Sequence, residues 1–196
     1  MIVKNGASTL ARCLESVRGI VDEIVVADTG STDRSPEIAL QYGTHVVHIP
    51  WEDDFSKARN LALQHGHADW VLYLDADEML DAEARQKIPS LLARADVMGY
   101  DVWRWNYVRT ITTREWDRPA QPNPHRIEAA RDFPAYVEDQ NIRLFRRHPD
   151  IFFEGKVHEG VADRIKRLGL KVADGGFLIH HLGIAEDTPE ARKAKN

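Results

Sequence analysis

Strand-like and helix-like segments alternate through the first eighty residues of the chain. Four apolar runs rich in β-forming residues are the strand candidates, at 1–4, 23–28, 45–50 and 70–74. Between them lie stretches with apolar residues at helical spacing, at 8–18, 36–42 and 55–66. Ser35 and Asp54 stand where two of these helices should be capped. Because strands joined by helices run parallel with right-handed crossovers, the alternation predicts an α/β sandwich.

The pattern changes in the second half. Asp81 is placed to cap a helix running to about Ala95, which Pro89 should kink or split. A long strand is then expected at 100–109, and a loop at 117–134, where four prolines lie in a polar context. Shorter strands are expected around a helix at 160–168, at 141–145, 151–153, 170–173 and 176–181. We therefore expect one domain with two halves, 1–98 and 99–196, the second being an α+β elaboration.

Composition narrows the function classes. A chain of 196 residues suits a single domain, and its formal net charge of −5 argues against nucleic acid as the main partner. There is no bilayer-spanning apolar run and no signal-peptide pattern, so we expect a cytoplasmic protein. The single cysteine, Cys13, is expected to be a small core residue rather than a catalytic thiol. Basic residues crowd 143–171 and could meet a phosphate-bearing ligand or the inner face of a membrane, although a solvated face is the commoner explanation.

Polar residues follow the predicted strands where a parallel sheet binds ligands, at the carboxyl ends. Lys4 and Asn5 follow the first strand, and Asp28 opens the sequence DTGSTD after the second. The hydroxyls and permissive backbone of DTGSTD suit a polar ligand. An Asx-type turn leading into a helix cap explains the same residues equally well.

The fourth strand ends in the acidic sequence DADE. An EF-hand loop would need glycine where Leu80 stands, and an aspartyl-phosphate phosphatase would need threonine or valine at Met79. No glycine-rich P-loop is present. The remaining metal site is one for Mg²⁺ or Mn²⁺, held by one or two of the carboxylates Asp75 and Asp77 and by ligand phosphates. For this pair taken alone, a solvated acidic turn is the commoner explanation.

Four linked motifs resemble the nucleotide-diphospho-sugar binding half of the family-two glycosyltransferases: MIVKNGASTLARCLESV, VDEIVVADTGSTDRSPEIA, WEDDFSKARNLAL and ADWVLYLDADE. Later segments are similar to one bacterial branch with a Val-His-Glu motif, namely NIRLFRRHPDIFFEGKVHEGV and IHHLG. The resemblance implies a GT-A fold, a Rossmann-like and mostly parallel sheet flanked by helices. The stretch 110–139 has no obvious counterpart.

The resemblance also implies roles for individual residues. Asp28 matches the aspartate that contacts the donor nucleoside, and Arg59 a basic residue near its base or diphosphate. Asp75 matches a ribose or metal contact, and Asp77 the direct ligand of Mn²⁺ or Mg²⁺. His181 is our choice for a further metal ligand, with His180 second. The expected donor-binding set is Lys4, Asn5, Asp28, Ser31, Asp33, Arg59, Asp75 and Ala76.

The family inverts the anomeric centre, so a carboxylate must accept the proton of the acceptor hydroxyl. Glu159 is the candidate base, with His158 as orienter or substitute. Alternatively, Glu159 only begins the helix expected at 160–168 and is stabilised by its dipole. The tryptophans Trp103, Trp105 and Trp116 are expected to shape the acceptor side, although core packing explains Trp103 or Trp105 at least as well.

Two functions remain in view. The first is a metal-dependent hexosyltransferase that uses a nucleoside-diphosphate sugar, with UDP expected, to extend a glycan, lipid-linked sugar or protein of the cell envelope. The second is a non-catalytic sugar-nucleotide or carbohydrate-binding module. A nucleotidyltransferase would need a glycine-rich loop after the first strand, and VKNGAST does not supply it. The chain also departs from the family, because it begins directly at MIVKN, has Gly6 where that branch has glutamate, and ends in the polar tail AEDTPEARKAKN.

Overall fold

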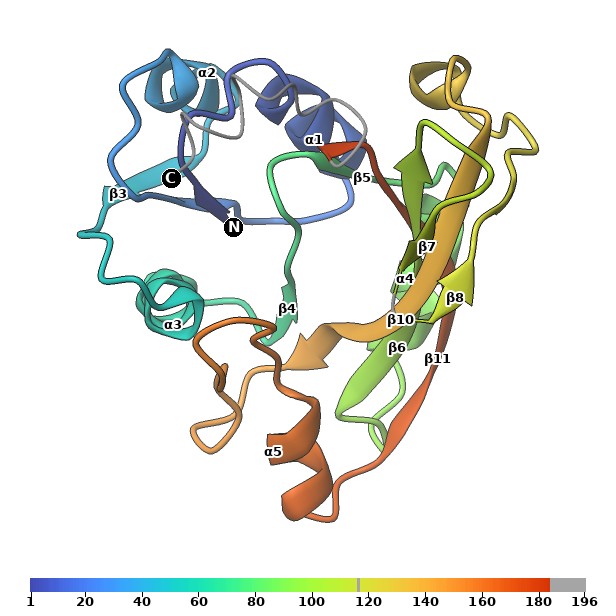
Figure 1. The fold of residues 1–196 in the computed structure, drawn as a ribbon. Helices are drawn as coiled ribbons and strands as arrows, with labels where there is room; N and C mark the ends of the chain where they lie inside the picture. The colour runs from blue at the N-terminus through green and yellow to red at the C-terminus, as the bar shows by residue number, and fades with distance from the viewer. Residues whose placement is uncertain (116, 184–196) are drawn as a thin grey trace.

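The computed structural model describes residues 1–115 and 117–183, which form two sheets with helices around them (Figure 1). The first sheet is parallel and three-stranded, in the order β1 (Ile2–Val3), β2 (Val25–Asp28) and β3 (His45–His48). The helices α1 (Leu10–Val17) and α2 (Ser35–Gln41) lie on one side of this sheet and α3 (Phe55–Gln64) on the other.

Local chemistry explains these helices. In α1 the residues at helical spacing, Leu10, Cys13, Leu14 and Val17, are all buried, so one face of the helix supplies core. Asp54 caps α3, since its carboxylate accepts a hydrogen bond of 3.1 Å from the Lys57 N–H. The predicted cap at Ser35 is wrong, because Ser35 is already helical. Asp33 instead accepts the Ser35 N–H at 3.0 Å.

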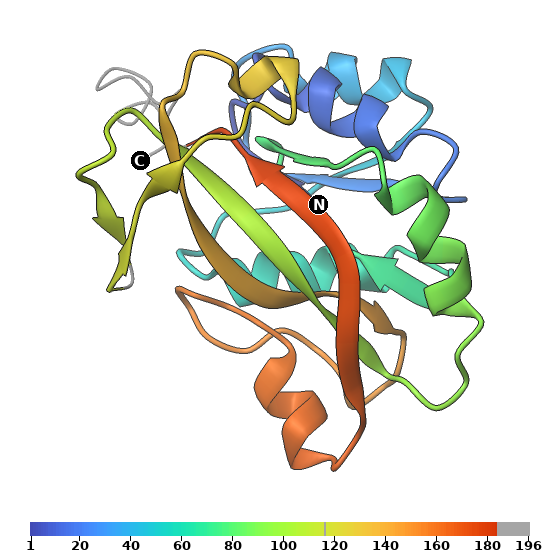
Figure 2. The same cartoon turned by 90° about the vertical axis from the view of Figure 1, so that its right-hand side faces the viewer.

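The second sheet has six strands and is mostly antiparallel. Its strands follow the order β4 (Trp70–Leu72), β10 (Ala135–Arg146), β6 (Gly99–Val108), β11 (Val172–His181) and β5 (Glu78–Leu80), and β9 (Gln121–Pro122) pairs with β10. Figure 2 shows the long strands β6, β10 and β11 running across the molecule, with α4 (Ala84–Leu92) packed beside β11. The remaining elements are a hairpin of β7 (Arg114–Glu115) and β8 (Arg118–Pro119), the 3₁₀ helix η1 (Glu128–Ala130) and α5 (Ala162–Arg167).

The expected parallel pairing of the fourth strand is not found. The α/β fold class is confirmed, but β4 ends at Leu72 and pairs antiparallel with β10, with Leu72 opposite Leu144 and Val71 opposite Phe145. These apolar partners place the two faces of β4 in two separate core clusters. A buried strand can be predicted from its own residues, whereas its pairing partner depends on distant residues.

Several predicted boundaries in the second half are also corrected. Pro89 lies inside one unbroken α4, which begins only at Ala84. Residues 151–153 form no strand, and the two strands expected at 170–173 and 176–181 are the single strand β11. The pairing of β11 with β6 shifts between Asp174 and Leu178, so the glycines there make an irregularity rather than a strand end.

The predicted loop at 117–134 contains β8, β9 and η1, so it is more ordered than its prolines indicate. Cys13 is fully buried, as expected, and burial raises the pKa of its thiol. Among the described residues, no helix is long and apolar enough to cross a membrane.

Candidate functional site

A cleft of about 830 Å³ lies between the carboxyl ends of the first sheet and one face of the second. Its walls come from the loop after β1, the start of α3, the acidic turn between β4 and β5, and the strands β6 and β10. The predicted residues that line it are Lys4, Arg59, Asp75, Ala76, Asp77, His158, Glu159 and His181. A smaller cavity of about 600 Å³, near Met1 and β4, includes only Arg59 of the predicted site residues.

The loops after β1 and β2 hold each other in place. Asn5 donates its N–H to the Ser31 hydroxyl at 2.9 Å, and its side-chain oxygen accepts the Thr32 N–H at 2.8 Å. Asp33 accepts the Ala7 N–H at 3.0 Å. Asn5, Ser31 and Asp33 thus shape the rim of the cleft, and they are absent from its lining.

Asp28 is buried at the end of β2 and is 3% exposed. Its carboxylate accepts the N–H groups of Gly30 and Ser31, at 3.2 to 3.3 Å, and lies 3.2 Å from His48 Nδ1. These bonds to residues two and three positions later form the Asx-type turn that was one of the two explanations of DTGSTD. The turn presents Thr29 to the cleft.

Arg59 of α3 joins two of the predicted carboxylates. Its Nη2 donates to Asp75 Oδ1 at 2.6 Å and its Nε to Glu159 Oε1 at 2.5 Å, although the three residues are far apart in sequence. The side chain is only 7% exposed. Burial alone would lower the pKa of Arg59, but the two carboxylates outweigh it and raise that pKa above its ordinary value. Arg59 is therefore a fixed cation that holds one oxygen each of Asp75 and Glu159.

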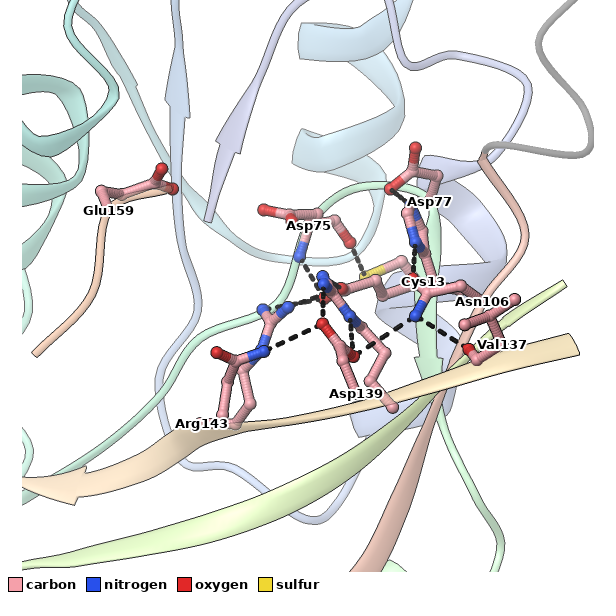
Figure 3. Close-up of polar contacts among 12 residues, drawn as sticks. Cys13, Asp75, Asp77, Asn106, Val137, Asp139, Arg143 and Glu159 are labelled. Carbon is pink, nitrogen blue, oxygen red and sulfur yellow. Dashed lines mark hydrogen bonds and ion pairs between the residues drawn. The ribbon is translucent and has the colours of Figure 1, made fainter. Parts of the chain in front are cut away.

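A buried network of arginines and carboxylates supports the acidic turn between β4 and β5. Glu78 is 1% exposed, and its carboxylate accepts bonds from the Asp75 N–H at 2.9 Å, from Arg104 at 2.9 Å and from both terminal nitrogens of Arg143. Arg104 also donates two hydrogen bonds to the Asp139 carboxylate, at 2.6 and 2.9 Å. Burial would raise the pKa of Asp75, but Arg59 and Arg143 lower it below its ordinary value. Figure 3 shows the side chains of Arg143 and Asp139 below Asp75.

Asp77 and His181 face each other at the edge of the cleft. Asp77 Oδ1 lies 3.5 Å from His181 Nε2, and the Asp77 carbonyl accepts the Leu182 N–H at 3.2 Å. Burial would lower the pKa of His181, but its contact with Asp77 raises it. A Cβ atom at Gly183 would lie 1.9 Å from Asp77 Oδ2, so the glycine leaves the space that this carboxylate occupies.

His180 points to the opposite face of β11. It is fully buried between Asp81 and the Tyr107 hydroxyl, at 3.1 and 2.9 Å, and stacks with Tyr107 at 5.9 Å between ring centroids. The second choice for a metal ligand is therefore wrong, because successive side chains of a strand alternate between faces and only His181 reaches the cleft.

The donor set at Asp77 fits a hard divalent cation that takes further ligands from a bound diphosphate. Among the described residues, no three His, Cys, Asp or Glu side chains converge as a metal cage. Asp77 and His181 supply one carboxylate and one imidazole, whereas Asp75 already bonds Arg59. Mg²⁺ and Mn²⁺ accept such partial protein coordination, completed by water and phosphate oxygens.

Glu159 and His158 come from the turn between Phe153 and α5. His158 is exposed and has a positive φ of 60°, and Glu159 has a side chain 11% exposed. The helix begins at Ala162, and the Glu159 carboxylate bonds Arg59 instead of the helix end, so the helix-dipole explanation of Glu159 is wrong. In Figure 3 Glu159 lies at the left and Asp77 at the upper right, with Asp75 between them.

Of the three tryptophans expected on the acceptor side, the described Trp103 and Trp105 do not line the cleft, whereas Trp51 does. Trp105 stacks on Tyr136 at 4.0 Å in a core cluster, and Trp103 lies near Arg118, whose guanidinium is 5.9 Å from its ring. Trp116 lies outside the described residues, and so do residues 184–196, which include the polar tail.

Most of the basic residues at 143–171 have protein partners. Arg143 bonds Glu78, and Arg146 and Arg147 donate to backbone carbonyls. Glu154 pairs with Arg164 and Arg167, and Asp96 pairs with Lys171. These contacts neutralise much of the local positive charge.

Sequence reasoning assigned no individual site role to five residues: Glu78, Arg104, Asn106, Asp139 and Arg143. Glu78 was noted only as part of the acidic sequence DADE, and Arg143 only as part of the basic segment 143–171. All are polar, and four of them lie on β6 or β10. The sequence did contain a signal for such residues. Arg104 and Asn106 alternate with aromatic residues in WRWNY, and Asp139, Asn141 and Arg143 occupy alternate positions on β10. Such alternation indicates a polar strand face, but it does not tell which face lines a cleft.

Comparison with known proteins agrees with this architecture. The family model described as "Glycosyl transferase family 2" matches residues 1–152. A TPR repeat-containing protein of Synechococcus elongatus is 39% identical over 98% of this chain and 43% of its own length. The lipopolysaccharide core biosynthesis glycosyltransferase LpsC of Rhizobium meliloti is 28% identical over 95% of this chain and 63% of its own length.

The chain thus spans less than two thirds of either relative. Among solved structures, S. aureus TarS in complex with UDP aligns with a TM-score of 0.58 and 17% identity, over 91% of this chain and 58% of that one, which shows the shared GT-A fold. The chain belongs to glycosyl transferase family 2.

Proposed function

We propose that this chain is the catalytic domain of an inverting, metal-dependent hexosyltransferase that uses a UDP-sugar. The observation that carries the proposal is the cleft itself, which has the Asp77 and His181 pair at one side and Glu159 at the other. A donor diphosphate at the first side and an acceptor hydroxyl at the second would lie on opposite sides of the sugar, as in-line displacement requires.

The donor half would be 1–98 and the acceptor half 99–196. Asp28 would contact the nucleoside, with Lys4, Thr29 and Ala76 lining its path and Asn5, Ser31 and Asp33 holding the rim. Asp77 and His181 would hold Mn²⁺ or Mg²⁺, which supplies positive charge to the departing diphosphate. Asp75 would orient the donor while Arg59 fixes its carboxylate.

Glu159 would act as the general base. Arg59 holds its Oε1, which leaves Oε2 to take the proton of the acceptor hydroxyl as the hydroxyl oxygen bonds to the anomeric carbon. The bond from that carbon to the diphosphate oxygen breaks in the same step, and the nucleoside diphosphate leaves. His158, exposed beside Glu159, would orient the acceptor.

UDP is supported by TarS, whose solved complex contains UDP. The name of LpsC points to cell-envelope glycans as the acceptor class, and a glycan, a lipid-linked sugar and a protein all remain within the proposal. We place the reaction in the cytoplasm, where it could meet the inner face of the membrane.

Donor turnover separates this proposal from a non-catalytic binding module. With a UDP-sugar and Mn²⁺, we expect slow release of UDP, and we expect Glu159→Gln to reduce it by ~10²-fold or more while UDP still raises the thermal midpoint. If UDP binds but no UDP-sugar yields free UDP, and if Glu159→Gln has no effect, the chain is a binding module instead.

Asp77→Ala tests the metal side of the same cleft. We expect it to abolish the Mn²⁺-dependent part of the UDP-induced thermal shift and to leave the unliganded midpoint almost unchanged. The matched control is Asp132→Ala, which removes the same group from an exposed position outside the cleft lining. Retention of Mn²⁺-dependent binding in Asp77→Ala would remove Asp77 from this role.

A further inference from the structure

The two ring nitrogens of His181 have different partners. Nδ1 lies 2.7 Å from the side-chain oxygen of Asn106, and Nε2 lies 3.5 Å from Asp77 Oδ1. A neutral imidazole carries its proton on one nitrogen and a lone pair on the other. Which nitrogen is presented to Asp77 as a lone pair therefore depends on the hydrogen bond at Nδ1.

The amide of Asn106 can be oriented in only one way. Its Nδ2 donates to the Val137 carbonyl at 3.1 Å and approaches Asp139 Oδ1 at 3.3 Å, and both partners are pure acceptors. The residue is fully buried on β6, so no solvent competes for these bonds. The amide oxygen must then face His181, and an oxygen acceptor requires a proton on Nδ1.

The neighbouring histidine has the opposite arrangement. His180 Nε2 lies 3.1 Å from the Asp81 carboxylate, which can only accept, so that nitrogen carries the proton. Its Nδ1 then accepts from the Tyr107 hydroxyl at 2.9 Å. Two adjacent residues of β11 are thus held in opposite tautomers by partners on opposite faces of the sheet.

We propose that Asn106 is a positioning residue that holds His181 as its Nδ1–H tautomer and so presents the Nε2 lone pair to Asp77. The carboxylate and the lone pair are then two acceptors 3.5 Å apart, an arrangement that a bound cation stabilises. The tautomer follows from the protein alone, and only its use in metal binding rests on the function proposed above.

The first test observes the tautomers directly. Long-range ¹H–¹⁵N spectra of protein labelled in its histidine rings distinguish a protonated nitrogen from one with a lone pair. They are recorded without metal as the pH is raised to about 9, and the tautomer of each ring is determined where its ¹⁵N shifts show that the ring is neutral. We expect Nδ1–H for His181 and Nε2–H for His180, with assignments from His181→Gln and His180→Gln. An Nε2–H form of His181 in the native protein would overturn the proposal.

Variants then connect the tautomer to Asn106. Asn106→Ala should shift His181 toward Nε2–H, because Asp77 becomes its best acceptor, and should leave His180 unchanged as an internal control. Asn141→Ala is the matched control for the tautomer, since Asn141 also donates to Asp139, at 3.1 Å, but is exposed on β10 and forms no hydrogen bond to His181 among the described residues. Asn106→Asp keeps an acceptor at Nδ1 and should retain the native tautomer if its second oxygen is protonated, so that it can still donate to Val137 and Asp139. The spectrum of the native protein keeps the test informative if neither variant folds.

The second readout is binding of Mn²⁺ in the presence of UDP, followed by the electron paramagnetic resonance signal of free Mn²⁺. We expect Asn106→Ala to weaken Mn²⁺ binding by ~10–100-fold, as is usual when the partner of a metal-binding histidine is removed. Asp132→Ala, outside the cleft lining, should have little effect. A changed tautomer with unchanged Mn²⁺ affinity would overturn the role of Asn106 in metal binding. Failure of the native protein to bind Mn²⁺ with UDP would instead contradict the proposed function and leave the tautomer result standing.

Discussion

Two buried arginines, Arg59 and Arg143, pair with the carboxylates that lie in and below the cleft. Arg59 and Arg143 lie over the ring of Tyr73, at 5.2 and 4.5 Å from its centroid, so one aromatic ring contacts both buried cations. Each keeps one buried nitrogen, Arg59 Nη1 and Arg143 Nε, without a hydrogen-bond partner among the described residues. Their charges stabilise the ionised form of Asp75, at the cost of imperfect hydrogen bonding.

A single glycine should control the position of Asp77. Gly183→Ala places a methyl group where Asp77 Oδ2 now lies, at 1.9 Å, so the carboxylate must rotate away. We expect Mn²⁺-dependent UDP binding to weaken roughly tenfold or more, as for loss of other groups that orient a metal ligand. Calorimetric titration with UDP and Mn²⁺ measures the effect.

The matched control is Gly160→Ala, because a Cβ atom there meets nothing within 4 Å. It should bind UDP and Mn²⁺ as the native protein does. Equal affinities for Gly183→Ala and the native protein would show that Asp77 does not need the space left by the glycine.

At the scale of elements, Glu78 connects three strands of the second sheet. It lies on β5, whereas its partners Arg104 and Arg143 lie on β6 and β10, and its carboxylate also accepts the Asp75 N–H in the acidic turn. The strand register and the shape of the cleft floor therefore depend on the same buried charge. β5 itself is only three residues long, so side-chain bonds contribute much of its attachment.

Removal of that charge should be costly. Glu78→Gln leaves Arg143 buried without a counter-ion, and we expect the free energy of unfolding to fall by about 3–5 kcal/mol. Urea denaturation followed by circular dichroism measures this change.

Glu83→Gln is the control, since Glu83 pairs with Lys87 on the exposed surface and should lower the free energy of unfolding far less than Glu78→Gln does. Equal effects of the two substitutions would contradict a structural role for the Glu78 network.

At the scale of the whole molecule, ionised carboxylates stabilise the fold on both sides of the cleft. Burial would raise the pKa values of Asp33, Asp75 and Asp139, but hydrogen bonds to Asp33 and the neighbouring arginines at the other two lower them below their ordinary range. Each therefore stabilises the folded state above the unfolded pKa of ~3.9, and that contribution is lost as pH falls toward the folded value.

We therefore expect the free energy of unfolding to decrease steadily as pH falls from about 5 to 3. Asp101 opposes the trend, because burial raises its pKa, but the groups with lowered pKa values outnumber it. Urea titrations across this range test the expectation, and Asp139→Asn should reduce the slope. A free energy that stays constant across the range would contradict the role of these carboxylates.

The sequence by itself determined the alternation of the first three strands and helices, the Asp54 cap, the burial of Cys13 and the clustering of strand-end residues at one edge. These features depend on local spacing and on the rule that parallel strands end together. The resemblance of four linked motifs gave the family. Neither could show that Asn5, Ser31 and Asp33 hold the rim, or that Trp105 belongs to the core.

Only the tertiary structure decided the antiparallel pairing of β4 with β10, the bridge from Arg59 to Asp75 and Glu159, and the orientation of the two histidines. The physical reason is the same in each case. The pattern of a strand determines which of its residues share a face. The residues that pack against that face, and the charges that they carry, lie up to a hundred positions away in the sequence.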